Sequence, residues 1–409
     1  MSTKKPTRFD DIDWSAISTT SSTWRGLSIN SILFLITGVP TALLAVYNWR
    51  FAAGDPLFLH LGERLGVEGA VESIGLVHNP SSLDMLFIFT LFLFLWYLIL
   101  PLYQNPRMTR YYWKEFRRNR PAVISLIWLL IVFAGGLIGP FLIPEPTFDV
   151  MSGRQPPVFA SISDGNVAAC VGEVIDGRCQ GTWEHPLGTT SGGRDVFDSV
   201  VHGMTISMQI GFITTTIVAA IGISFGTVSA YSGGWVDEVL MRFVDVVISF
   251  PTLPFYLLIL YSFGASLAMF ILVFAIFAWG GTARYVRSKA LSISEEEFIK
   301  ASKLSGASRV RVIRGHVVPN TASSIITQLT LLIPAFLLAE AQIAFLGLGD
   351  SEVPSWGQLI SQGRTDLEIA PWIILVPGTA LFLTILAFNF LGDALLDALN
   401  PEAEAEADR

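Results

Sequence analysis

The chain has 409 residues, of which 52% are apolar and only 15% are charged. Soluble domains carry roughly 25% charged residues, so this composition excludes an ordinary soluble protein. The net charge of −8 argues against a general nucleic-acid-binding surface. Apolar runs of roughly 20 residues recur along the chain, and each is long enough to cross about 30 Å of hydrocarbon. The sequence therefore predicts a polytopic membrane protein.

Eight apolar runs are predicted to be membrane-spanning helices of an all-α fold. They are residues 27–49, 85–103, 122–143, 205–230, 243–263, 267–284, 323–346 and 371–395. The first run follows a long polar lead, lacks a small-residue cleavage pattern and ends with Tyr47 and Trp49. We therefore expect an uncleaved helix there and not a signal peptide. Residues 1–110 form a predicted N-terminal extension with two helices, residues 111–400 the main transmembrane domain, and residues 401–409 an acidic tail.

Basic residues are distributed unevenly among the predicted connections. The connector between the second and third runs holds Arg107, Arg110, Lys114, Arg117, Arg118 and Arg120, opposed by Glu115. If both termini are cytoplasmic, the cytoplasmic side collects 20 of the 26 Lys and Arg residues. The positive-inside rule therefore predicts cytoplasmic termini. Residues 144–203 then form an extracytoplasmic loop, and residues 285–320 form a cytoplasmic loop.

Both cysteines, Cys170 and Cys179, lie in the loop 144–203. Outside the cell a disulfide between them is reasonable, and two free thiols are the alternative. A zinc site is not expected, because His185 is the only nearby histidine and no set of four ligands forms.

Polar residues within the apolar runs are scarce; they are Asp245, Glu340, Gln342, Asn389 and Asp393. Ionisable groups at membrane depth are functional candidates, for example in a proton pathway. Because these residues lie mostly near predicted helix ends, we favour roles in interhelical packing or at the interface. The sequence contains no phosphate-binding loop and no evident catalytic constellation, so neither ATP hydrolysis nor a bound cofactor is predicted for this chain.

The polar stretch 295–319 separates two apolar runs and is predicted to form two short helices hinged at Gly306. Ser294 and Glu297 fit a capping box for the first helix, and Gly306 suits the left-handed conformation that ends it. Pro319 predicts that the second, basic helix ends just before it. A nucleic-acid-binding helix pair is disfavoured because the adjacent apolar runs leave no third helix to support it. A solvated loop without a partner is the other alternative.

The spacing of Ala301-Ser302, Gly306 and Pro319 resembles the EAA loop of ABC importer permeases. In that family the loop forms the coupling helix that docks into the ATP-binding subunit. Lys300 stands where the family usually has glutamate, so a salt bridge made by that glutamate does not transfer to this chain. The coupling residues implied by the resemblance are Lys300, Ala301, Ser302, Leu304, Ser305, Gly306, Ala307, Ser308 and Pro319.

From about Tyr111 onward the chain resembles the dipeptide/oligopeptide branch of these permeases. Its extracytoplasmic signature is matched by His185, Pro186, Leu187, Gly188 and Thr189, followed by Gly193, Arg194 and Asp195. Shorter matching strings are residues 233–238, 345–349, 354–357 and 389–393. The resemblance implies a core of six helices, so the two N-terminal helices are an addition for which we expect a packing role.

The resemblance also implies a function and partners. The implied function is that of a non-catalytic permease subunit in the cell membrane. The implied partners are a second permease subunit, two ATP-binding subunits that carry ATP and Mg²⁺, and an external substrate-binding protein. Di- and oligopeptides are the expected substrates, and nickel or another small solute is the alternative within the branch. An ion-gradient-driven secondary transporter is the competing class. It requires midmembrane ion ligands on broken helices and an internal repeat, and neither is evident in the sequence.

Overall fold

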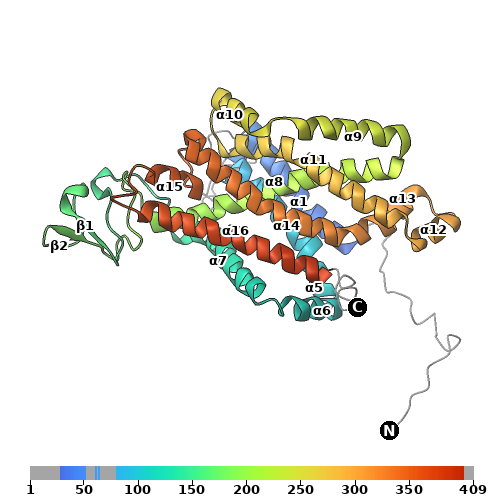
Figure 1. Ribbon diagram of the computed structural model, residues 1–409, viewed down its shortest axis with the longest axis horizontal. Coiled ribbons are helices and arrows are strands. Elements are labelled where there is room, and N and C mark those ends of the chain that lie inside the picture. The colour runs from blue at the N-terminus through green and yellow to red at the C-terminus, as the bar shows by residue number, and fades with distance from the viewer. Residues whose placement is uncertain (1–27, 52–59, 62, 65–79, 400–409) are drawn as a thin grey trace, which may run out of the picture.

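The computed structural model describes residues 28–51, 60, 61, 63, 64 and 80–399. These residues form an elongated helical bundle (Figure 1). A small β-sheet lies at one end, and the two short helices α12 (Glu297–Leu304) and α13 (Arg309–Val312) lie at the other. The predicted all-α membrane fold is confirmed.

The other helices of the described residues are α1 (Ile29–Phe51), α4 (Ser82–Phe94), α5 (Leu100–Gln104), α6 (Pro106–Phe116), α7 (Arg120–Leu142), α8 (Val196–Ser232), α9 (Gly234–Ser249), α10 (Thr252–Phe263), α11 (Leu267–Ser294), α14 (Val318–Ile343), α15 (Trp356–Gly363) and α16 (Trp372–Leu399). π-Helical turns occur at η2 (Leu95–Ile99), η5 (Ile313–Val317) and η6 (Ala344–Leu348), and 3-10 turns at η3 (Val150–Ser152) and η4 (Asp164–Asn166). Seven helical segments in the described part of the chain are long and apolar enough to cross a membrane. The bent pair α9 and α10 makes an eighth if it is one span.

The fifth predicted span, residues 243–263, is not one continuous helix. α9 ends at Ser249 and α10 begins at Thr252, and their axes differ by 71°. Pro251 and Pro254 explain the break, because proline lacks the N–H that continues a helix and disfavours helical geometry in the residue before it. The predicted run therefore merges the end of one helix with another that points in a different direction.

The N-terminal helices α1 and α4 pack against each other, and α4 also packs against the bundle. Trp96 Nε1 donates a hydrogen bond of 2.9 Å to Thr37 Oγ1, which links η2 to α1. On the other side of α4, the ring of Phe87 lies edge-on to Phe212 of α8, with centroids 6.3 Å apart. Helix α4 thus lies between α1 and the rest of the bundle.

Helices α8 and α11 form the central pair. A Cβ atom added at Gly226 would lie 2.5 Å from the backbone oxygen of Ala283, and one added at Gly222 would lie 2.8 Å from Thr282 Cβ. The glycines therefore let the two backbones approach closely, as small residues do where membrane helices pack without a hydrophobic driving force between them.

The loop between α7 and α8 is an ordered cap with a three-stranded antiparallel sheet. Its strands are β1 (Ser161–Ser163), β2 (Val174–Ile175) and β3 (Arg178–Gln180), in the order β1-β3-β2. The loop is predicted to extend to residue 203, whereas α8 begins at Val196, so residues 196–203 are part of the helix. Asp195 caps this helix by accepting hydrogen bonds from the N–H groups of Phe197 and Asp198.

Candidate coupling site

The projecting end of the bundle is built from the end of α11, the short helices α12 and α13, and the start of α14. A small core holds it together: Ile299 of α12 is 0% exposed, and it packs with Ala290 of α11, Val312 of α13 and Val317 of η5. Because these residues come from four consecutive elements, the loop is fixed to both long helices that carry it.

Gly306 ends α12 in the manner predicted. Its φ is +83°, in the left-handed region that glycine adopts without a steric penalty. The N–H of Ala307 bonds the carbonyl of Ser302 at 3.2 Å, and the N–H of Ser305 bonds that of Ala301 at 3.0 Å. The bond from Ala307 to Ser302 spans Gly306 and is typical of a Schellman motif, so the turn satisfies carbonyls at the end of the helix.

Two details of the predicted loop are wrong. Ser294 does not cap α12; it is the last residue of α11, and its Oγ donates to the Leu291 carbonyl at 2.8 Å. The chain also stays helical through Pro319, which lies in the first turn of α14. The π-turn η5 precedes it, with the N–H of Val318 bonded to the carbonyl of Ile313, and such a wider turn lets a continuous helix accommodate a proline.

The structure places the other predicted coupling residues on or near the outer surface. Leu304 is 89% exposed, which is unusual for a large apolar side chain, and no residue in the described part of the chain covers it. Lys300, Ala301, Ser305, Ser308 and Pro319 are exposed, and Ser302 and Ala307 are half-buried. Phe298 was not among the predicted residues; it is 45% exposed and lies edge-on to His316 with ring centroids 6.1 Å apart. Phe298 and Leu304 are thus the two large apolar side chains that α12 exposes.

Two ion pairs next to this loop were also missed by the sequence analysis. Asp237 of α9 accepts bonds from Arg287 Nε at 2.6 Å and Nη2 at 2.5 Å, and from the hydroxyl of Ser229. Asp245 accepts a bond of 2.5 Å from Arg284 Nη2. The sequence signal that could have indicated the first pair was Asp237 in the string 233–238, together with Arg284 and Arg287 at and just after the end of the apolar run 267–284. Both pairs fasten α9 to the half of α11 that leads into the coupling loop.

At the opposite end, the predicted signature residues form the base of the loop between α7 and α8. His185 Nδ1 lies 2.8 Å from Asp195 Oδ2, and Thr189 is bridged to Asp195 through the backbone. Gly188 has φ +80°, and a Cβ there would lie 2.6 Å from Trp372 Nε1, which donates to the Thr189 carbonyl. These residues therefore join the loop to the starts of α8 and α16.

The remaining signature residues are also packed in this base. Arg194 is 5% exposed, and its guanidinium carbon lies 3.7 Å from the centroid of the Phe148 ring. Gly193 has φ +75° and lies too close to the Asp149 carbonyl for any side chain. Leu187 packs against the main core, and the carbonyl of Pro186 accepts the N–H of Val158.

The two cysteines are joined in the same loop. Cys170 Sγ and Cys179 Sγ are 2.01 Å apart, and Cys179 on β3 is fully buried. The bond links the central strand to the segment before β2.

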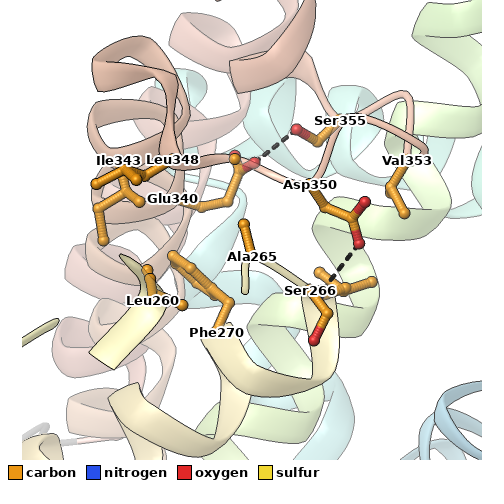
Figure 2. Close-up of a pocket in the computed structure, with 12 residues that line it drawn as sticks. Leu260, Ala265, Ser266, Phe270, Glu340, Ile343, Leu348, Asp350, Val353 and Ser355 are labelled. Carbon is orange, nitrogen blue, oxygen red and sulfur yellow. Dashed lines mark hydrogen bonds between the residues drawn. The ribbon is translucent and has the colours of Figure 1, made fainter. Parts of the chain in front are cut away.

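A small cavity lies at this end of the bundle, between the turn from α10 to α11 and the segment from α14 to α15 (Figure 2). Glu340 of α14 faces Ser355 there, and its Oε1 accepts a hydrogen bond of 2.5 Å from the Ser355 hydroxyl. Asp350 Oδ2 accepts the N–H of Leu267 at 3.2 Å, which holds the start of α11. Glu340 thus has the interhelical role expected for it, while Asn389, among the residues described, bonds the carbonyl of Ile385 in its own helix. Within the described residues, no group of three or more His, Cys, Asp or Glu side chains is arranged to hold a metal ion.

Comparison with known proteins identifies the family. The family described as binding-protein-dependent transport system inner membrane component matches residues 222–404, and the N-terminal TM domain of oligopeptide transport permease C matches residues 107–157. The dipeptide transport system permease protein DppC of Bacillus subtilis is 35% identical over 292 residues, which cover 71% of this chain and 84% of that protein. The chain belongs to this family.

Two further relatives of this permease have comparable similarity. The DppC protein of Alkalihalophilus pseudofirmus is 33% identical over 294 residues, which cover 71% of this chain and 89% of the relative. The glutathione transport system permease protein GsiD of Escherichia coli O6:K15:H31 is 32% identical over 295 residues, with the same coverage. The chain is a multi-pass permease component of the inner membrane. The two family matches begin at residues 107 and 222, so α1 and α4 lie outside both.

Proposed function

We propose that this permease forms, with a second permease subunit, the translocation pathway of an ATP-driven importer for di- and oligopeptides. Two ATP-binding subunits hydrolyse ATP, and an external binding protein delivers the substrate. The chain itself catalyses no reaction. The relatives named for dipeptide and glutathione transport support peptides as the substrate class.

The projecting loop is the observation that carries this proposal. Its exposed apolar residues, Phe298 and Leu304, offer a docking surface, and the buried Ile299 cluster makes that surface rigid. An ATP-binding subunit that moves on closing would move α12, and with it α11 and α14. Coupling requires such a contact, whose geometry differs between the two states of the transporter.

The charge distribution supports the orientation that coupling needs. With the loop 285–320 and both termini in the cytoplasm, 20 of the 26 basic residues lie on the cytoplasmic side. The disulfide loop then lies outside the cell, where such bonds persist. The domain division at about residue 110 is part of the same proposal, with α1 and α4 as an added pair beside the six-helix core.

The first test replaces Gly306 by tryptophan in the assembled complex. At φ +83° a side chain strains the turn, and a large one blocks close docking of α12. We expect normal membrane insertion, loss of the ATP-binding subunits on purification and loss of ATP-driven uptake. Gly177 is the matched control, because it has φ +72° and the same open surroundings but lies in the turn between β2 and β3. Gly177→Trp should retain the ATP-binding subunits. Retention of the subunits and normal uptake with Gly306→Trp would refute the coupling role.

The second test concerns the substrate and the energy source. Mass spectrometry of the ligand retained by the cognate binding protein should detect peptides. Detection of nickel or another small solute instead would replace the peptide assignment while leaving the importer intact. Uptake that is driven by an ion gradient without ATP would place the chain among the secondary transporters.

A further inference from the structure

Helix α6 (Pro106–Phe116) lies where the chain turns back toward the membrane. It follows the span 82–104 after a single residue and is separated from α7 by a short turn. In Figure 1 it lies at the same end of the bundle as α12 and α13. A helix between two membrane spans, too short and too polar to cross the bilayer itself, has to lie at the bilayer surface.

One face of α6 is packed against the protein. Phe116 is buried with Ala122 of α7 and Ala394 of α16. Thr109 and Tyr112 are half-buried. Thr109, Tyr112 and Phe116 follow one another three and then four residues apart, which places them on one face of the helix. This packing fixes the rotation of α6 and therefore determines which side chains face outward.

The outward face carries a row of cations. Arg107, Arg110 and Lys114 follow one another at helical spacing and are all exposed; we call these three residues the basic stripe. The aromatic rings of Tyr111 and Trp113 flank the stripe, and each of these residues is 45% exposed. Among the residues that the structure describes, Glu115 is the only carboxylate on this helix, and it pairs with Arg118 at 2.5 Å and not with the stripe.

We propose that the basic stripe binds the head groups of anionic phospholipids in the leaflet at this end of the bundle. Cations on a helix that lies at the bilayer surface meet lipid phosphates, whose negative potential attracts them. Tyrosine and tryptophan rings favour the same depth, between head groups and hydrocarbon. The row of charge, the aromatic flanks and the buried opposite face thus match a lipid surface. This inference does not depend on the coupling role of α12.

Native mass spectrometry of the full chain tests the proposal, with phosphatidylglycerol and phosphatidylcholine as probes. Each basic residue near an anionic surface contributes roughly a fivefold gain in affinity, so R107Q/R110Q/K114Q should bind phosphatidylglycerol on the order of a hundredfold more weakly. Binding of phosphatidylcholine should not change. Free glycerol phosphate should not displace the bound lipid, because the stripe binds a membrane surface and not an isolated phosphate.

Two controls and a single-site variant make the result decisive. R107K/R110K/K114R keeps the charge and should bind phosphatidylglycerol as the unaltered chain does. Arg242→Gln removes a cation elsewhere, on α9, and should have no effect. The single variant Arg110→Gln should weaken binding about fivefold, which provides a measurement if the triple variant fails to fold. Unchanged phosphatidylglycerol binding in a folded triple variant would overturn the proposal. So would phosphatidylglycerol binding that appears only after removal of residues 401–409, because the acidic tail would then be what the stripe binds.

Discussion

His185 shows how one side chain connects the signature to the long helix behind it. Its imidazole hydrogen-bonds Asp195, and this bond raises the pKa of His185 above its ordinary value. The other oxygen of Asp195 accepts the first N–H groups of α8. The carboxylate therefore serves the histidine and the positive end of the helix dipole at once.

The raised pKa of His185 predicts a pH-dependent stability. The charged pair contributes fully below the unfolded value near pH 6.5, and this contribution is lost as the pH rises through the raised folded pKa. We expect His185→Gln to lower the free energy of unfolding by on the order of 1 kcal/mol at about pH 6, and by less at about pH 9. Thermal unfolding of the purified chain in detergent measures both. The same loss at the two pH values would show that the charged form contributes nothing.

Single residues of the coupling loop were predictable to different degrees. The turn at Gly306 was correctly predicted because it depends on the backbone conformation of that one residue, and glycine enters the left-handed region without strain. Ser294 was misassigned because a serine suits several local hydrogen bonds, and the length of α11 decides which one forms. Phe298 was missed because its exposure depends on where α12 rotates its other face, with Ile299, into the core.

At the scale of elements, two ion pairs connect α9 to α11. The Asp237–Arg287 pair has two hydrogen bonds, and its side chains are 19% and 32% exposed. The Asp245–Arg284 pair has one hydrogen bond and is about half exposed, at 49% and 50%. Water screens the second pair more strongly, so the first should contribute more to holding α9 against α11.

We expect this difference to appear when each carboxylate is neutralised. Asp237→Asn leaves the Arg287 charge partly buried without its partner and should cost about 2 kcal/mol of stability. Asp245→Asn, the matched control on the same helix, should cost less than about 1 kcal/mol. Thermal unfolding of both variants in the same detergent makes the comparison. A larger loss for Asp245→Asn would contradict the ranking by exposure.

At the scale of the whole molecule, α8 and α11 connect the two ends. Helix α8 has 37 residues and a length of about 55 Å, well beyond the roughly 30 Å of the hydrocarbon core. It begins at the signature and ends beside the coupling loop, and it packs along α11, which carries that loop. A close and rigid contact between these helices would carry a displacement at the coupling loop toward the opposite end.

Gly226 tests the importance of this contact. A valine there would press on the backbone of α11, because even its Cβ would lie 2.5 Å from the Ala283 oxygen. We expect Gly226→Val to cost about 1 to 3 kcal/mol of stability and to reduce ATP-driven uptake. Gly281, on α11 itself, has no atom within 4 Å of an added Cβ, so Gly281→Val should change stability by less than about 0.5 kcal/mol. Equal effects of the two variants would show that close packing at Gly226 does not matter.

The sequence by itself determined the membrane class, the number of apolar runs, the glycine hinge and the family, because each depends on local properties such as transfer free energy, backbone freedom and motif spacing. Only the tertiary structure decided that α8 begins at Val196, that the fifth run breaks after Ser249, and that the helix continues through Pro319. It also selected Arg287 as the partner of Asp237. The ion pair joins residues 50 positions apart and leaves no periodic trace in the sequence. Each helix boundary depends on local capping and proline residues, and the sequence offers several such positions close together, of which the folded chain uses one.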